Sequence, residues 1–549
     1  MVRMKTSQSV IKKITKSYHQ AKEKLGYGTF ENRYMEMIED PPENRSNRLC
    51  VSLSDIHLTD GTVGFQNLSD KTWSAFYDTI AQRCRKYTIK EFVLVLDGDI
   101  VDMVRSSRWA EHGIYPWERE RTAEFSKVVN LIIREIVEQR HINFFKWLQG
   151  LKIRLKQDSG VDKVKIVILL GNHDKELFCD QEALKYFYEK GLGQSIEAIS
   201  EEERRSLGRM YGDEKMFLDP TQAPYFPFYY GDKGFRYFAT HGQWRDADNN
   251  AKIEETETTP GWSTADGWCI DTWQKLRFSP FFEPCFGDTV ATGVLSTFIY
   301  KIKQRLAEIE YEDPRLNCIF DELDLYRPTH AAIKRVLDEV DSMRKKGVKD
   351  EVTKIIEETL YECVMDWLSW EFTYQSSTPI YRIGLKFIKR TLVWMKSLDS
   401  VRGARLEIKS MAGLLSVSDF IARFSPSSVS LRKMKTFPSF MPSYQHYNFQ
   451  IHGEGHTHEP LQEDLNVSTK YPSTYINFGT WRDQILLRKG SGYRRRGVLR
   501  AFFILDIVND DKNTKDQSPR TFDYFVQDVV HWSDDKDAMN KNGRYEPKT

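Results

Sequence analysis

Short apolar runs rich in β-branched residues recur in the first part of the chain, and each predicts a buried strand. These strands cover Arg48–Leu53, Glu91–Leu96 and Val164–Leu170, and helical stretches lie between them at Lys71–Tyr87 and Trp117–Gln157, the second with a break near Gln139–Asn143. Consecutive strands joined by helices pair in parallel, because the helix carries the chain back to the same end of the sheet. The pattern therefore predicts a layered α/β domain.

A second group of predicted strands lies far downstream. Gly234–Thr240 and Tyr447–His452 predict a fourth and a fifth strand, and Thr474–Phe478, Leu499–Val508 and Thr521–Val530 predict strands of an antiparallel meander. The intervening residues are helical and rich in aromatic side chains, with runs at Val290–Glu308, Thr329–Lys346, Glu351–Tyr374 and Arg382–Lys396. This insertion could be a lid over a binding site, an oligomer interface or a second packed core.

These patterns divide the chain into four parts. Residues 1–45 form an N-terminal helical extension and linker, residues 46–245 and 446–549 form the two parts of one core, and residues 246–445 form the helical insertion. In the extension, apolar residues at helical spacing predict an amphipathic helix over Val10–Leu25. This helix would pack on the domain surface, or it would act as an arm for a partner or a membrane surface.

Composition narrows the class of protein. The 80 Lys and Arg residues nearly balance the 79 Asp and Glu residues, so no overall basic field favours nucleic acid. A basic run at Arg488–Arg500 keeps a nucleic-acid partner possible without favouring it. The 7 cysteines are scattered, which is typical of reduced thiols in a cytoplasmic protein. Because no secretory signal and no transmembrane segment is recognisable, we expect a soluble cytoplasmic protein.

Side chains that can bind metal ions follow the predicted strands at five places. They are Asp55 and His57, Asp99, Asn172 and His173, His241, and finally His456 and His458. Each one alone has an ordinary interpretation, as a turn or cap residue at a strand end or as a buried polar side chain. Together and in this order they favour a metal site, because parallel strands place their carboxyl ends at one edge. Oxygen and imidazole ligands without cysteine suit manganese, iron, zinc, cobalt or nickel.

The order of these residues resembles the motif pattern of the calcineurin-like metallophosphoesterase superfamily. The chain carries the five motifs as Asp55-Ile-His57, Gly98-Asp-Ile-Val-Asp102, Gly171-Asn-His-Asp174, His241-Gly242 and Gly455-His-Thr-His458. The resemblance covers residues 46–245 and 446–530, but neither the insertion nor the N-terminal helix. It implies a four-layer αββα sandwich with the site at the edges of the sheets.

The resemblance also implies a role for each residue. Two sets of three ligands would each hold one metal ion, and they are Asp55, His57 and His458 for one ion and Asn172, His241 and His456 for the other. Asp99 would bridge two divalent ions, with manganese expected first and iron, zinc, nickel or cobalt as alternatives. His173 would be the general acid for the leaving group, and Asp174 would orient its ring. Asp102 would hold a ligand or the following turn in place.

The implied activity is hydrolysis of a phosphomonoester, a phosphodiester or a pyrophosphate by a hydroxide that two metal ions activate. Elementary chemistry supports it, since two cations polarise phosphoryl oxygens and lower the pKa of a bound water, and a positioned imidazole can protonate a leaving alkoxide. The alternative is a DNA or RNA nuclease of the double-strand-break repair type, which shares the motifs. A non-catalytic scaffold on the same fold is disfavoured, because every ligand position is intact.

Residues beside the motifs bear on the substrate. The stretch from Asp102 to Trp109, together with Pro460 after the last motif, is similar to the UDP-diacylglucosamine hydrolase-like bacterial branch. Arg105 or Arg108 within that stretch could bind a phosphate bidentately, or could form a surface salt bridge. The substrate would then be a phosphoester that is nucleotide-linked or lipid-linked. His452 is a spare imidazole before the last motif, where it could support a ligand or shift the ligand register.

Overall fold

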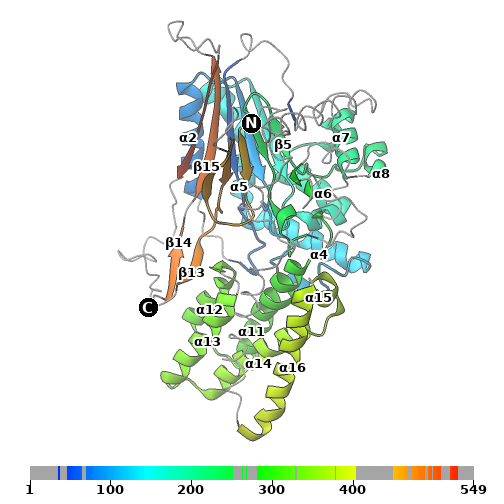
Figure 1. Cartoon of the computed structure of the whole chain (residues 1–549), viewed down its shortest axis with the longest axis vertical. Coiled ribbons are helices and arrows are strands. Elements are labelled where there is room, and N and C mark those ends of the chain that lie inside the picture. The colour runs from blue at the N-terminus through cyan, green and yellow to red at the C-terminus, as the bar shows by residue number, and fades with distance from the viewer. Residues whose placement is uncertain are drawn as a thin grey trace, which may run out of the picture.

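The structure, a computed structural model, is a mixed α/β fold with mixed sheets (Figure 1). It describes residues 35–36 and 46–528, apart from 65–67, 69, 212, 247, 251–261, 264–266, 269–280, 328–329, 378, 403–448, 467–472, 489–491, 498 and 509–519. The helix predicted for Val10–Leu25 lies outside the described residues. Within them, no helix is long and apolar enough to cross a membrane.

A five-stranded sheet carries the first three predicted strands. Its strands, in the order β16-β15-β2-β3-β4, are Arg520–Asp528, Arg500–Val508, Arg48–Leu53, Glu91–Asp97 and Lys163–Leu169. β2, β3 and β4 run parallel, whereas β15 is antiparallel to both β2 and β16. All residues of β2 are buried, which explains why this strand is mostly apolar and does not alternate between apolar and polar residues, although Arg48 and Ser52 are polar.

A second, six-stranded sheet carries the fourth and fifth predicted strands. Its strands, in the order β1-β5-β6-β10-β12-β11, are Met35–Glu36, Tyr230–Asp232, Tyr237–Ala239, Ile451–Glu454, Ser473–Asn477 and Leu461–Asn466. The expected antiparallel meander is wrong for β12, which runs parallel to β10. The reason is β11, a mostly polar and largely exposed edge strand that the sequence pattern did not reveal. The chain runs back along β11 before it enters β12, so β12 is antiparallel to β11 and parallel to β10.

The two large sheets pack face to face. Phe502 of β15 contacts Tyr237 of β6 and also Phe478, which directly follows β12, with ring centroids 5.8 and 6.0 Å apart. A polar contact also links the two sheets, since the Arg48 guanidinium of β2 donates hydrogen bonds of 3.2 and 2.7 Å to Asp232 of β5. The ligand-bearing strand ends therefore come from two facing sheets, not from neighbours in a single parallel sheet.

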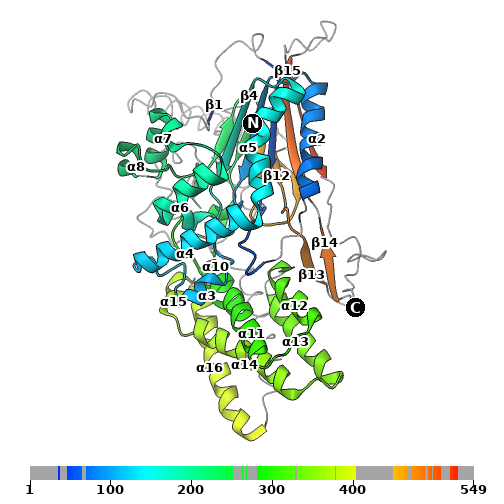
Figure 2. The same ribbon diagram turned by 180° about the vertical axis from the view of Figure 1, so that it is seen from behind.

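Helices cover the outer face of the five-stranded sheet (Figure 2). In α2 (Asp70–Lys86), Trp73 stacks on Trp481 at 5.1 Å and contacts Phe144 of α5 (Ile142–Ser159) at 4.6 Å. α4 (Thr122–Arg134) continues as a π-helical turn, and the helical stretch breaks at His141, where a break was predicted. The other helices of the first core part are α3 (Arg108–His112), α6 (Gln181–Tyr186), α7 (Glu201–Tyr211) and α8 (Glu214–Leu218).

The insertion gathers at one end of the molecule as a helical bundle (Figures 1 and 2). Its helices are α10 (Phe286–Asp288), α11 (Thr297–Glu308), α12 (Pro314–Asp321), α13 (His330–Lys345), α14 (Asp350–Trp367), α15 (Glu371–Ser376) and α16 (Pro379–Arg402), with a π-helical stretch at Thr289–Ser296 before α11. Phe298, Ile302 and Ile356 belong to a hydrophobic cluster distinct from that of the sheets. The bundle therefore has its own core.

A small sheet ties this bundle to the C-terminal part of the core. β9 (Tyr326–Arg327) pairs in parallel with β13 (Gln484–Arg488), which pairs antiparallel with β14 (Gly492–Arg496). The basic run seen in the sequence is therefore a hairpin. Its Arg495 forms ion pairs with Asp483 and with Glu322 of the insertion, so part of its positive charge is neutralised internally. A further short strand pair joins β7 (Trp262–Ser263) and β8 (Gly267–Trp268).

Candidate metal centre

The predicted ligands lie on tight turns after strands, and these turns share an uncommon backbone conformation. Eight described non-glycine residues have a left-handed backbone, and five of them are the predicted ligands Asp55, His57, Asp99, His456 and His458. Such residues cost about 1–3 kcal/mol each and concentrate at functional sites. Glycine lets the turns approach one another, because a Cβ at Gly455 would collide with the Ser54 and Asp55 side chains.

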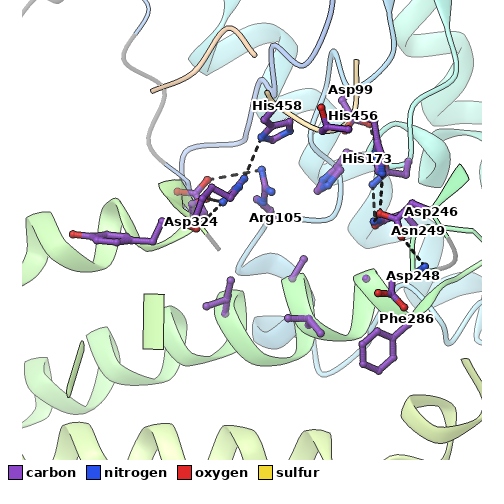
Figure 3. Close-up of a pocket in the computed structure, with 18 of the residues that line it drawn as sticks. Asp99, Arg105, His173, Asp246, Asp248, Asn249, Phe286, Asp324, His456 and His458 are labelled. Carbon is purple, nitrogen blue, oxygen red and sulfur yellow. Dashed lines mark hydrogen bonds and ion pairs between the residues drawn. The ribbon is translucent and has the colours of Figure 1, made fainter. Parts of the chain in front are cut away.

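Four buried side chains form the first group of candidate ligands, and Figure 3 shows two of them, Asp99 and His458. Asp55, His57, Asp99 and His458 each offer a ligand atom, and these atoms all lie within 4.8 Å of one another. His458 Nε2 is 3.0 Å from Asp55 Oδ1 and 2.9 Å from His57 Nε2. Asp99 Oδ2 is 3.7 Å from His57 Nε2. Two imidazole nitrogens and two carboxylates at such distances could hold a metal ion.

The second predicted set also reaches Asp99. His241 Nε2 is 3.3 Å from Asp99 Oδ2, the same oxygen that faces His57. Asn172 Oδ1 is 3.0 Å from His456 Nδ1, and the rings of His241 and His456 meet edge to face with centroids 5.4 Å apart. The structure therefore brings the sequence-predicted ligands together, and one histidine of each set faces Asp99 Oδ2.

The hydrogen bonding of the cluster fits a bound cation. Asp55 Oδ1 and His241 Nε2 are buried without a hydrogen bond of normal geometry, although buried polar atoms usually make one, and their close polar neighbours are the candidate ligands His458, at 3.0 Å, and Asp99, at 3.3 Å. His241 Nδ1 lies 2.7 Å from the Asp97 carbonyl oxygen, so Nδ1 carries the proton and Nε2 presents a lone pair. A positive ion would supply the missing partner for both atoms. The donor set is thus suited to a metal ion on the chemistry of its own atoms.

Asp102, and not Asp174, orients the ring of His173. Asp102 Oδ1 is 2.8 Å from His173 Nδ1, and its other oxygen is 2.9 Å from His57 Nδ1. We expected Asp174 to hold the His173 ring, and this expectation is wrong. Burial opposes ionisation of Asp102, but His173 and Arg105 hold the pKa of its carboxyl well below the usual range. An ionised Asp102 therefore fixes a ligand and the candidate proton donor together.

Asp174 instead shapes the turn that carries Asp99. Its carboxylate accepts backbone hydrogen bonds from Asp99, Ile100 and Val101 at 2.7, 2.9 and 2.9 Å, and from Gly171 at 3.0 Å. Consecutive side chains in this turn point to different sides. Asp174 therefore does not bond the His173 ring, although the two residues are neighbours in the sequence. Burial and the neighbouring Asp99 charge raise the pKa of Asp174 to about 7.

A cavity of about 350 Å³ opens beside the cluster, and the insertion forms much of its wall (Figure 3). The core lines it with residues that include Asp99, Asn172, His173, His456 and His458. The insertion lines it with apolar residues, with Gly287 and Asn249, and with four charged residues; the apolar ones include Phe286, Val290, Leu295, Leu323, Ile333 and Trp367, and the charged ones are Asp246, Asp248, Asp324 and Arg327. Whatever enters this cavity therefore contacts both the candidate ligands and the helical bundle.

Three predicted residues remain, which are Arg105 and Arg108 as possible phosphate ligands and His452 as a possible support for a metal ligand. Among these three, only Arg105 lines this cavity. Arg108 donates hydrogen bonds to Glu135 at 3.1 and 2.7 Å and pairs with Glu111, so it is the surface salt bridge that the sequence left open. His452 is buried on β10 and its Nε2 lies 2.9 Å from Glu454 Oε1. His452 does not line the cavity, and His456 and His458 hold the ligand positions without a shift of register.

Several residues at the site were not predicted from the sequence. Asp246 Oδ2 accepts a hydrogen bond of 3.0 Å from His456 Nε2, which leaves Nδ1 facing Asn172. Asn249 accepts a hydrogen bond of 3.3 Å from the Asn172 amide. Arg327 donates a hydrogen bond of 3.2 Å to His458 Nδ1 from the insertion. Asp246 follows His241 closely enough to have been a candidate, but no sequence signal placed Arg327 here.

Comparison with known proteins adds no assignment. No protein-family model matches this chain, and no curated protein matches it in sequence. The geometry of the buried Asp and His cluster, together with the cavity beside it, is therefore the basis on which its function is inferred.

Proposed function

We propose that this protein is a metal-dependent phosphoester hydrolase with the four-layer αββα architecture of the calcineurin-like metallophosphoesterases. One observation carries the proposal, which is that His57 of one ligand set and His241 of the other both approach the same oxygen, Asp99 Oδ2, at 3.7 and 3.3 Å. A carboxylate in that position can bridge two cations about 3.5–4 Å apart, the spacing of two-metal phosphoryl chemistry. The two facing sheets and the helices outside the first of them are compatible with that architecture.

The residues divide between two divalent ions, with manganese as the expected metal. Asp55, His57 and His458 would hold one ion and Asn172, His241 and His456 the other. When bound, the ions would polarise the phosphoryl oxygens and supply a water of lowered pKa as the nucleophile. The mixed oxygen and imidazole ligands also suit iron, zinc, nickel or cobalt.

His173 is the proposed proton donor for the leaving group. It lines the cavity, and its Nδ1 proton is donated to Asp102, so the other ring nitrogen is available for the substrate. Asp102 stabilises the protonated ring, which can then release a proton to the departing oxygen. Burial lowers the pKa of His173, so the ring gives up its proton readily. This arrangement needs no covalent intermediate with the protein.

The test is hydrolysis of bis-p-nitrophenyl phosphate, with the metal content measured on the same sample. We expect turnover that depends on added Mn²⁺, and we expect Asp99→Ala to lose both bound metal and turnover. Arg108→Gln, which changes a charged residue outside the cavity, should keep both. A wild-type protein that binds no transition metal and shows no Mn²⁺-dependent turnover would refute the proposal. Single-stranded and double-stranded DNA belong in the same panel, to test the nuclease alternative.

A further inference from the structure

Two residues at the start of the insertion contact the predicted ligands of the second ion. Asp246 Oδ2 is 3.0 Å from His456 Nε2, and Asn249 Oδ1 is 3.3 Å from Asn172 Nδ2. Asn249 Nδ2 in turn donates a hydrogen bond of 2.7 Å to Asp246 Oδ2. Figure 3 shows Asp246 and Asn249 next to His456. Neither residue belongs to the five motifs, and neither has a task in the proposed chemistry.

These four side chains form a closed ring. The ring closes where His456 Nδ1 lies 3.0 Å from Asn172 Oδ1. Each of the two predicted ligands therefore uses one polar atom to contact the pair from the insertion, and turns its other polar atom toward the other ligand. Asp246 and Asn249 thus lie where they can determine which atom of each ligand is available to a metal ion.

Asp246 sets the direction of the hydrogen bonds in this ring. A carboxylate can only accept, so the His456 Nε2 and Asn249 Nδ2 atoms that face it both carry protons. Asn249 then offers its carbonyl oxygen to Asn172, which donates through Nδ2. The Oδ1 atom of Asn172 is left facing His456 Nδ1, and in a neutral imidazole that is protonated on Nε2 this nitrogen bears a lone pair.

Two acceptor atoms therefore face each other at one point of the ring. Asn172 Oδ1 and His456 Nδ1, which lie 3.0 Å apart, need a positive partner, and that partner is either a second proton on the imidazole or a metal ion. An amide oxygen and an imidazole nitrogen both suit divalent transition metals. The nitrogen with which a histidine binds a metal is commonly set by the hydrogen bond that its other nitrogen donates.

We propose that Asp246 and Asn249 are positioning residues of the second metal ion, which select Asn172 Oδ1 and His456 Nδ1 as its ligand atoms. The inference rests on the metal centre of the proposed function, but not on the reaction that occurs there. It divides the work between two parts of the chain. The motifs of the core supply the ligands, and the first residues of the insertion orient two of them.

The packing of the insertion holds this pair in place. Asp246 Oδ1 accepts a hydrogen bond of 3.0 Å from the Asp248 N–H, and the Asp246 carbonyl oxygen accepts one of 3.0 Å from the Asn249 N–H, so the pair lies on one tight turn. The N–H of Gly287 in α10 donates a hydrogen bond of 2.7 Å to the Asp248 carbonyl oxygen. Gly287 lies so close that a Cβ there would collide with Asn249 Oδ1.

Mn²⁺ binding to the full chain tests the proposal, in a titration followed by the electron paramagnetic resonance signal of the free ion. We expect wild type to bind two ions per chain and to show the spectrum of a spin-coupled pair when loaded. We expect Asp246→Ala to bind the first ion as wild type does and the second about 10–100-fold more weakly, the usual loss when the outer partner of a ligand is removed. Asp246→Asn, whose amide oxygen can still accept from His456, should lie between them.

Two further variants separate positioning from other effects. Gly287→Ala changes no residue of the ring but displaces Asn249, so it should also weaken the second ion alone. Asp248→Asn removes a negative charge from the same turn and keeps the backbone N–H that Asp246 accepts, so it should weaken the second ion far less than Asp246→Ala does.

The outcomes separate this inference from the proposed function. If Asp246→Ala weakens both ions equally, or leaves the second unchanged, the positioning role is overturned. If the variants behave as expected but wild type does not hydrolyse bis-p-nitrophenyl phosphate, the proposed function fails and the positioning role stands. A wild type that binds fewer than two ions overturns the positioning role, and one that binds none and shows no turnover overturns both proposals.

Discussion

Asp102 connects a candidate metal ligand to the candidate proton donor. Its two oxygens face His57 Nδ1 and His173 Nδ1, so each ring presents its Nε2 atom away from the carboxylate. The two rings meet edge to face with centroids 4.8 Å apart. A single carboxylate thus sets the orientation of both rings. Each histidine can be substituted alone, so the role of each can be tested separately.

We predict that His173→Ala keeps bound metal and loses turnover. The His173 ring contacts that of the candidate ligand His57, but alanine keeps the His173 backbone N–H that donates to Asp99 Oδ1. The proposed task of the ring is proton transfer, which contributes about 10²–10⁴-fold to a rate. We expect kcat to fall within that range while metal content stays at the wild-type level. His57→Ala is the matched control, since it should lose metal as well. Loss of metal from His173→Ala would show that His173 is itself a ligand.

The order of the residues along the chain was enough to predict that these Asp and His side chains gather in a cluster that could hold a metal ion, but the supporting contacts were not predictable. Apolar runs show where strands end, and the end of a strand fixes where the residues that directly follow it lie. Asp174 was misassigned because a turn has no periodicity that fixes where each side chain points. Arg327 was missed because its position depends on the pairing of β9 with β13, which links segments far apart in the sequence.

At the scale of single elements, the break between α4 and α5 anchors the loop after β2. His141 stands at that break, and its Nε2 donates a hydrogen bond of 2.9 Å to the carbonyl oxygen of Thr59. Burial lowers the pKa of His141 from 6.5 to about 4, since a charged ring would be poorly solvated there. The folded chain therefore favours the neutral ring, whereas the unfolded chain protonates it near pH 6.5.

We predict that His141 destabilises the fold as the pH falls. Above pH 6.5 the ring is neutral in both states and has no effect; between about 6.5 and 4 the unfolded state binds the extra proton, so the free energy of unfolding decreases. His141→Gln keeps a side-chain amide that can donate to Thr59 and cannot titrate. Urea unfolding at pH 7 and pH 5 should show a smaller loss for His141→Gln than for wild type. Equal losses in both proteins would contradict the prediction.

The elements themselves were largely predictable, and their pairing was not. β2 was expected at its observed bounds, because a buried parallel strand leaves a mostly apolar run. β11 left no such signal, since this largely exposed edge strand has only two apolar residues, Leu461 and Leu465, among polar ones. The distribution of strands between two sheets depends on contacts such as that between Tyr237 and Phe502, which join segments more than 200 residues apart in the chain.

At the scale of the whole molecule, one buried ion pair joins the turn that carries His173 and Asp174 to the insertion. Lys175 directly follows Asp174, and its Nζ is 2.8 Å from both oxygens of Asp288 and 3.1 Å from Cys285 Sγ. Asp288 also accepts a backbone hydrogen bond of 2.8 Å from Cys285. Both charged side chains are almost fully buried, so each depends on the other for its charge compensation.

We predict that Lys175→Met destabilises the protein by about 3–5 kcal/mol, because it leaves the Asp288 carboxylate buried without a counter-ion. Adding Asp288→Asn should restore much of the loss, since the amide removes the charge and its oxygen can still accept the Cys285 backbone hydrogen bond. The control is Lys334→Met, which breaks an exposed pair with Asp338 on α13 and should cost less than about 1 kcal/mol. Denaturant unfolding followed by tryptophan fluorescence measures all three variants at one Mn²⁺ concentration. A Lys175→Met protein as stable as the Lys334→Met control would mean that the insertion is held against the turn of His173 and Asp174 by its apolar contacts alone.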